Sequence, residues 1–244
     1  MLIEQYFNKM RERLDALAAN PEPIRQAAQI CADALAHGGA IHVFDSGHLV
    51  SHELINRAGG LVAMNRLAFS LNVDNSVKTR SDLPLPPGNS LSYGYIEHVF
   101  ATGQLRPGDV LFVGSVSGKT ANVIELAIQG RTHGLTVIAL TALAYSSRLE
   151  SEHPSGKHLY EAADLVLDNG APYGDGMLEV EGLEHPICPA SGVDAAMLMW
   201  AVVAGIVEEM LKRGLKPSVY ASINRPDGWT LYHQVEEEAR RKGY

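Results

Sequence analysis

Three hydroxyl side chains and a glycine lie close together after an apolar run: Ser115, Ser117, Gly118 and Thr120. A helical pattern over 120–133 follows them, so the free backbone N–H groups and the positive end of the helix dipole point at this loop. A glycine there lets the backbone approach a bound anion closely. A helix cap needs only one Ser or Thr, so this density of donors favours a binding site for an anion such as phosphate.

The same loop contains Gly-Lys-Thr, which raises the alternative of a nucleotide-binding P-loop. That motif requires GxxxxGK[ST] after a strand. Here Gly114 stands only four positions before Gly118, and Val113 occupies the place of the first glycine. The spacing therefore disfavours a nucleoside triphosphatase, although Asp168 is a candidate magnesium ligand.

A second polar loop, Ser46, Gly47 and His48, follows the first predicted strand. Ligands of parallel sheets bind beyond the carboxyl ends of the strands, so two such loops can hold one molecule from two sides. Glu53 lies one to two helical turns farther on, within reach of a sugar held there. The alternative for Glu53 is a solvated helix face with an ion pair to Arg57 at i+4.

The histidines give little support for a metal site. His48 and His52 could share a helix face at i, i+4, but no third ligand stands at a suitable spacing. We therefore expect neither a metal nor another cofactor. His98, with Glu97 beside it, fits an acid/base pair or the surface equally, and His185 has no assigned role.

Short apolar runs closed by Gly, Ser, Asp or Asn alternate with helical patterns, and this alternation is typical of a parallel sheet. We predict five strands, at 40–45, 61–65, 109–114, 136–141 and 165–168. Helices are expected at 2–19, 21–37, 49–58, 92–102, 120–133 and 193–213. The fold class is therefore α/β, a five-stranded parallel sheet flanked by helices, with two N-terminal helices before it.

The chain has 244 residues, which fits one α/β domain with an added helical segment. We expect an N-terminal helical segment over 1–38 and the main domain over 39–244. Two amphipathic helices cannot cover their apolar faces alone, so they must pack on this domain or on another subunit. The proline-rich stretch 70–89 is a candidate lid, and the tail over 217–244 has no assigned role.

Composition excludes several classes of protein. With 20 basic and 28 acidic residues the net charge is −8, which disfavours nucleic acid and anionic membrane surfaces as partners. The apolar run 195–207 is shorter than the roughly 20 residues of a membrane span. Cys31 and Cys188 form no CxxC motif or Cys/His cluster, so we expect a reducing, cytoplasmic location.

Taken together, these motifs resemble those of the sugar isomerase (SIS) domain family. Within it they are most similar to a bacterial branch whose members resemble phosphoheptose isomerases. The resemblance covers most of the chain. It depends on Phe44-Asp-Ser-Gly-His48, His52-Glu-Leu-Ile-Asn-Arg-Ala-Gly-Gly60, Ser115-Val-Ser-Gly-Lys-Thr120, and His153-Pro-Ser-Gly-Lys157 with Leu167-Asp-Asn-Gly170.

The resemblance implies a Rossmann-like three-layer fold and a phosphosugar bound by the two polar loops. It implies subunits paired through helices as a homodimer or higher oligomer, with sites near the interface. Carried over by motif, the substrate-binding residues would be Ser46, Gly47, Ser115, Ser117, Gly118 and Thr120. Glu53 would be the acid/base of an aldose–ketose isomerisation, with His48 or His52 moving protons between sugar oxygens.

Two departures leave other functions open. Phosphoheptose isomerases usually have a GNGGS-type first loop, where this chain has Asp45-Ser-Gly-His48. Their second catalytic histidine lies on the last long helix, but residues 193–213 contain no histidine, and His185 only precedes them. A phosphosugar sensor without turnover and a sugar-phosphate lyase or etherase are the alternatives. A sensor needs the hydroxyl loops but no general base.

Overall fold

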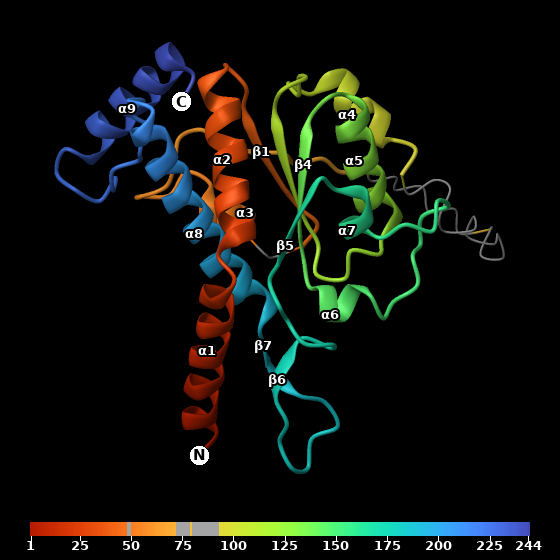
Figure 1. The fold of residues 1–244 in the computed structure, drawn as a ribbon. Coiled ribbons are helices and arrows are strands. Elements are labelled where there is room, and N and C mark those ends of the chain that lie inside the picture. Colours follow the sequence, from red (N-terminus) through yellow and green to blue (C-terminus); the bar gives the residue numbers. More distant parts are fainter. Residues whose placement is uncertain (48–49, 72–78, 80–92) are drawn as a thin grey trace.

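The structure is a computed structural model that describes residues 1–47, 50–71, 79 and 93–244. Its centre is a parallel sheet with strand order β2-β1-β3-β4-β5 (Figure 1). This confirms the predicted fold class. The strands are β1 Ile41–Asp45, β2 Met64–Arg66, β3 Val110–Gly114, β4 Thr136–Thr141 and β5 Leu165–Asp168.

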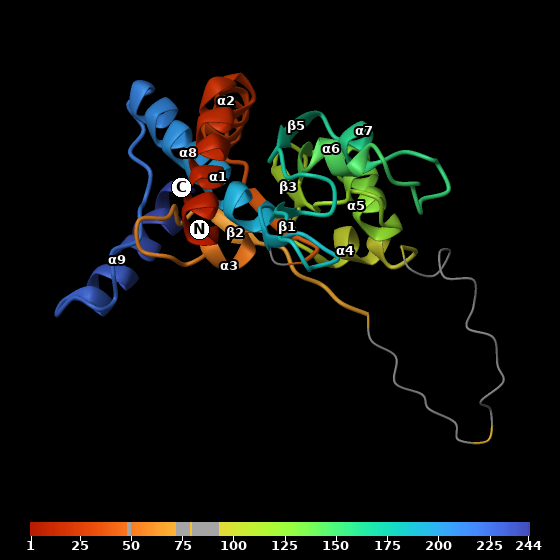
Figure 2. The ribbon, with the colours of Figure 1, turned by 90° about the horizontal axis from the view of Figure 1, so that it is seen from below.

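Helices cover both faces of the sheet, which explains why its strands are nearly continuous apolar runs. In β3, Val110 and Phe112 face one core cluster, while Leu111 and Val113 face the other. Figure 2 shows the helices on the two sides of the strands. The first cluster includes residues of α2 (Glu22–Ala36) and α8 (Ser191–Lys212), and the second those of α4 (Ile96–Thr102) and α5 (Ala121–Thr132).

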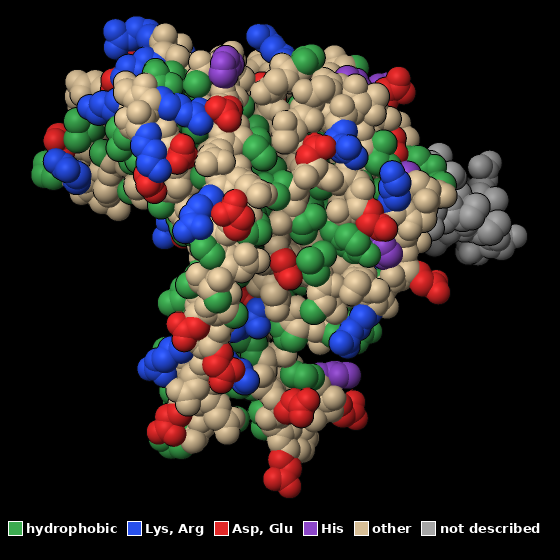
Figure 3. All heavy atoms as spheres, in the orientation of Figure 1, with side chains coloured by type: hydrophobic (Ala, Val, Ile, Leu, Met, Phe, Trp, Pro, Cys, Tyr) green, Lys and Arg blue, Asp and Glu red, His purple; other side chains and the backbone are tan. Residues whose placement is uncertain are grey.

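The two N-terminal helices behave differently. α2 packs against α8, and Gly205 permits close approach, because a Cβ there would lie 2.7 Å from the Cβ of Ala28. α1 (Leu2–Ala19) has no buried residue and extends away from the sheet (Figure 1). Arg13 ties it to the fold through an ion pair with the buried Asp194 of α8. Along α1, apolar side chains are interleaved with charges of both signs on the face shown in Figure 3.

α8 is the long apolar helix of the structure. By length and composition alone it could cross a membrane. Its buried side chains, among them Leu198, Met199 and Ile206, belong to the core cluster that α2 and the sheet complete. Its apolar composition therefore reflects burial inside the domain, as the sequence pattern predicts.

Several predicted boundaries are wrong. The helix predicted over 49–58 is only α3, Ser51–Leu54, because Ile55 is extended and Asn56 has a positive φ of 53°. The strand predicted over 61–65 begins later, at Met64, since Leu61 instead forms an isolated bridge with Val219. Most of the proline-rich stretch 70–89 lies outside the described residues.

The sequence patterns also missed five short or C-terminal elements. They are α6 Leu143–Ser146, α7 Leu159–Ala162, the hairpin of β6 Gly176–Leu178 and β7 Ile187–Pro189, and α9 Gly228–Lys242. The hairpin lies directly before α8. In the tail, the ring of Tyr220 stacks on Tyr232 of α9, with centroids 4.9 Å apart.

Candidate functional site

A pocket of about 300 Å³ lies at the carboxyl ends of β1 and β3. These strands are neighbours in the sheet although β2 lies between them in sequence, so this is the point where the strand order reverses. Open α/β sheets bind their ligands at such a switch point. Asp45 is in register with Gly114, and the Ser46 amide donates to the Gly114 carbonyl at 3.0 Å. The lining residues are Asp45, Ser46, Gly47, Ser115, Val116, Ser117, Tyr145 and Asp175.

The loop after β3 is shaped by Gly118. Its φ of +54° is a left-handed conformation that favours glycine. The Gly118 amide donates to the Oγ of Ser115 at 3.3 Å, and its carbonyl accepts from the Leu159 amide at 2.8 Å. Thr120 is the N-cap residue of α5, but its side chain makes no capping hydrogen bond to that helix. The loop thus directs Ser117 to the pocket and holds Thr120 at the start of α5.

Lys119 does not extend toward the pocket as a phosphate-binding lysine. Its Nζ contacts Glu152 Oε1 at 2.7 Å, and this hydrogen bond raises the pKa of the lysine. An anion in the pocket would therefore be held by hydroxyls, by backbone N–H groups and by the dipole of α5. This arrangement differs from a P-loop, as the failed motif spacing indicates.

The loop after β1 is held by Asp45. Its carboxylate accepts hydrogen bonds from the Gly47 amide at 3.0 Å and from the Val50 amide at 2.7 Å. Ser46 and Gly47 line the same pocket as Ser117. His48 lies outside the described residues.

Glu53 is engaged elsewhere. Its Oε2 pairs with Arg57 at 2.8 Å, and its Oε1 accepts from Trp200 Nε1 of α8 at 3.2 Å. Its carboxylate is half-buried, and among the described residues it does not belong to the pocket lining. His52 is exposed on the same short helix and does not line the pocket either. Of the predicted binding residues, Ser46, Gly47, Ser115 and Ser117 line the pocket, whereas Gly118 and Thr120, like the expected base, do not.

Four lining residues were not identified as site residues from the sequence: Asp45, Val116, Tyr145 and Asp175. Asp175, in a left-handed turn with φ +68°, accepts hydrogen bonds from both the amide and the Oγ of Ser191 at 2.7 Å. It joins the pocket to the start of α8. Tyr145 packs edge to face on Tyr173, with ring centroids 5.1 Å apart. The segment Tyr173-Gly174-Asp175-Gly176 has the composition of a turn, but nothing in the sequence indicates that it lies beside the pocket.

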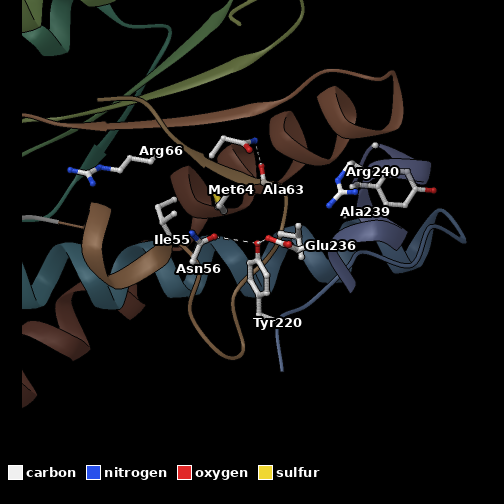
Figure 4. A pocket seen from close by; sticks show the side chains of 13 residues that line it. Ile55, Asn56, Ala63, Met64, Arg66, Tyr220, Glu236, Ala239 and Arg240 are labelled. Carbon is white, nitrogen blue, oxygen red and sulfur yellow. Dashed lines mark hydrogen bonds between the residues drawn. The ribbon is translucent and has the colours of Figure 1, made fainter. Parts of the chain in front are cut away.

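A larger hollow of about 490 Å³ lies beyond the edge strand β2, under α9. Figure 4 shows Tyr220 at its centre, where the phenol hydrogen-bonds Asn56 Oδ1 at 3.2 Å and Glu236 Oε1 at 3.3 Å. None of the hydroxyl-loop residues lines it. The smaller pocket, with its convergent donors, is therefore the candidate functional site.

Within the described part of the chain, no three His, Cys, Asp or Glu side chains are grouped to hold a metal ion. The donors at the candidate site are hydroxyls and amides instead.

Comparison with known proteins agrees with this geometry. The sequence model of the SIS domain matches residues 5–142, a stretch that includes the strands β1 and β3 and both hydroxyl loops. The chain belongs to the SIS domain family. The match begins within α1, so the family region also includes both N-terminal helices.

Relatives of this SIS protein extend along nearly the whole chain. The UPF0309 protein lmo0025 of Listeria monocytogenes is 35% identical over 243 residues, 96% of this chain and 95% of the relative. A UPF0309 protein of Streptomyces avermitilis is 36% identical over 221 residues, 89% of this chain and 86% of the relative.

Solved structures share the fold at lower identity. A phosphoheptose isomerase from Neisseria gonorrhoeae is 21% identical, with a TM-score of 0.50, and the match covers 84% of this chain and 97% of that one. A phosphoheptose isomerase from Francisella tularensis is 19% identical, with a TM-score of 0.51 and coverages of 84% and 96%. The family match and the relatives confirm the predicted resemblance to the SIS family, and these structures share its fold.

Proposed function

We propose that this SIS protein binds a sugar phosphate between the loops that follow β1 and β3 and interconverts its aldose and ketose forms. The observation that carries this proposal is the convergence of Ser46, Gly47, Ser115 and Ser117 on one pocket at the switch point of the sheet. The shared fold with proteins named phosphoheptose isomerases supports the same class of substrate.

The phosphate would lie at the N-terminus of α5, against the loop 115–120. Ser117 and Thr120 would donate hydroxyl protons to it, and Gly118 permits the left-handed turn between them. Hydrogen bonds to a charged group contribute about 1.5–3 kcal/mol each. The sugar would then extend toward Ser46 and Gly47.

The isomerisation needs a base that removes a proton from the carbon next to the carbonyl and returns it to the other carbon. Glu53, on the helix after the first loop, is the residue we propose for this step. The Glu53 carboxylate is paired with Arg57 at 2.8 Å, so it would have to break this ion pair before it could contact the sugar. His48 or His52 would move protons between the sugar oxygens.

The position of Glu53 also supports a second candidate function, a phosphosugar sensor without turnover. Such a protein needs the hydroxyl loops but leaves Glu53 free to stabilise the fold through Arg57 and Trp200. A lyase or etherase would use the same base as the isomerase and break a different bond.

We also propose that a second copy covers α1, which makes the protein a homodimer or higher oligomer. Leu2, Ile3, Phe7 and Leu14 of α1 are 43–69% exposed. Burial of such side chains is worth about 1.5–3 kcal/mol each. Light scattering at micromolar concentration should give at least twice the chain mass of 26.4 kDa, and a monomeric mass would contradict the proposal.

We place the protein in the cytoplasm, which suits its two free cysteines.

Binding is tested by a thermal-shift screen of phosphorylated sugars, since a ligand at 100 times its Kd stabilises by about 2.7 kcal/mol. Ser117→Ala and Thr120→Val should each weaken binding about 10-fold or more. Thr132→Val is the matched control, because Thr132 lies at the other end of α5 and donates to the Ile128 carbonyl. Equal affinity in Thr120→Val and Thr132→Val would place the phosphate elsewhere.

Catalysis is tested by Glu53→Gln, which keeps the shape of the side chain but cannot take a proton. This variant should retain binding and lose turnover by about 10²–10⁴-fold. Glu237→Gln, at an exposed position on α9, is the control. Binding without deuterium incorporation from solvent in the parent protein would favour the sensor, and unchanged turnover in Glu53→Gln would exclude Glu53 as the base.

A further inference from the structure

The motif His153-Pro-Ser-Gly-Lys157 does not contribute to the pocket lining, yet it forms a polar relay of its own. The Oγ of Ser155 lies 2.7 Å from Nδ1 of His153. The opposite ring nitrogen, Nε2, lies 2.8 Å from Oε2 of Glu125 on α5. Gln129, one turn along α5, donates to the other carboxylate oxygen at 2.8 Å. A hydroxyl, an imidazole and a carboxylate are thus aligned in hydrogen-bond contact.

These contacts fix the tautomer of the histidine. An ionised carboxylate only accepts hydrogen bonds, so Nε2 carries the proton that it donates to Glu125. Nδ1 of a neutral ring is then the acceptor, and it receives the Ser155 hydroxyl and, at 3.1 Å, the Ser155 amide. The lone pair of the imidazole is therefore directed at the serine, which is the arrangement that general-base activation of a nucleophile needs.

Burial strengthens the relay. The side chain of His153 is 8% exposed and that of Glu125 is 17% exposed, so solvent screens their interaction weakly. The ring of Tyr93 also packs on His153, with centroids 5.2 Å apart. Ser155 itself is exposed, at a turn closed by the Gly156 amide on the His153 carbonyl at 2.9 Å. The base is shielded while the nucleophile remains accessible.

A hollow lined in part by Lys157 lies two residues along the chain from Ser155. It is shallow, with a volume of about 420 Å³ between α5 and α7, and the Lys157 amide donates to Ser155 Oγ at 3.3 Å. Apolar side chains, among them Ile128 and Leu135, form part of its wall. The exposed ammonium of Lys157 would stabilise a negative charge that develops on a substrate oxygen.

We propose that Ser155, His153 and Glu125 form a nucleophilic triad that gives this protein a second activity, the hydrolysis of small carboxylic esters. Ser155 Oγ would bond to the ester carbonyl carbon as its proton passes to His153 Nδ1. The C–O bond to the alcohol would then break, and the alkoxide would take that proton. Water would release the acid from the acyl-serine by the same steps, and Glu125 would stabilise the imidazolium throughout.

The test uses the full chain and a fluorophosphonate probe. Attack by Ser155 forms an Oγ–P bond, fluoride leaves, and the chain gains one phosphonyl group that intact mass and peptide mapping detect. We expect labelling at Ser155 in the parent and in Ser147→Ala, whose exposed serine lies in the same segment between β4 and α7. Ser155→Ala should abolish labelling. The parent and Ser147→Ala should also hydrolyse p-nitrophenyl acetate, whereas Ser155→Ala should not.

Glu125→Gln separates a triad from a merely exposed serine, because it keeps the size of the side chain and removes its charge. Labelling should slow by about 10²-fold or more, while thermal melting shows that the variant is folded. Absence of label in the parent, label at another residue, or an unchanged rate in Glu125→Gln would each overturn the proposal. Sugar-phosphate binding should be unaltered in Ser155→Ala, so the proposed function is tested separately.

Discussion

Gly118→Ala should destabilise the protein through two separate effects. The residue has a φ of +54°, and a Cβ there would lie 2.9 Å from Ser146 Oγ and 3.1 Å from Leu159 Cβ. The left-handed conformation costs an L-residue about 1–2 kcal/mol, and overpacking a filled interior costs about 1–3 kcal/mol. Together they predict a loss of about 2–5 kcal/mol in the free energy of unfolding.

Urea unfolding followed by circular dichroism measures this loss, and Gly174→Ala isolates its two parts. Gly174 also has a positive φ, of 81°, but a Cβ added there meets nothing within 4 Å among the described atoms. Gly174→Ala should therefore lose only about 1–2 kcal/mol. The difference in the free energy of unfolding between the two variants measures the cost of crowding beneath the loop 115–120.

Ser146→Ala completes the experiment. Its hydroxyl is buried and has no hydrogen-bond partner among the described residues, so its removal should be neutral or stabilising. In the double variant Gly118→Ala/Ser146→Ala the new methyl group gains space, and the two effects should differ from additivity by about 0.5–3 kcal/mol. Equal losses in Gly118→Ala and Gly174→Ala, or strict additivity in the cycle, would refute the packing argument.

Three further predictions concern the helices and the thiols. Arg13→Ala strands the buried carboxylate of Asp194 and should cost about 3–5 kcal/mol in urea unfolding, whereas Arg11→Ala, at an exposed position, should stay within about 0.5 kcal/mol; similar losses would contradict this. Burial raises the pKa of Asp194, so the native state binds its proton more tightly than the unfolded chain and stability falls as pH rises above about 4. Asp194→Asn should flatten that part of a pH series of urea midpoints. Burial also raises the pKa of Cys31, so a thiol reagent at pH 8 should titrate only Cys188 in the folded protein and both thiols after unfolding.

The sheet was predictable because its signal is local. Each central strand is an apolar run closed by a turn residue, and the crossover helices carry their own periodicity. The pairing of Glu53 with Arg57 was likewise foreseen as one of two alternatives, since it depends only on an i+4 spacing. The convergence of the loops after β1 and β3 follows from parallel strands that end at one edge.

Features that depend on distant parts of the chain were not predictable. Asp175 and Tyr145 reach the pocket only because the hairpin and the segment after β4 fold over the ends of the strands. α3 ends early because Asn56 adopts a positive φ that its residue type permits but does not require. The contact between Tyr220 and Tyr232 of α9 joins residues that no local spacing in the sequence connects.

The packing of α2 on α8 constrains the order in which the chain folds during synthesis. Synthesis of α2 is complete at Ala36, but its packing partner α8 begins only at Ser191. At about 5–20 residues per second the interval lasts roughly ten to thirty seconds. During that time Ala28, Cys31 and Leu35 have no α8 to cover them, although all three are buried in the finished fold. A chain truncated before α8 should therefore bind chaperones and aggregate, even though it contains every strand of the parallel sheet.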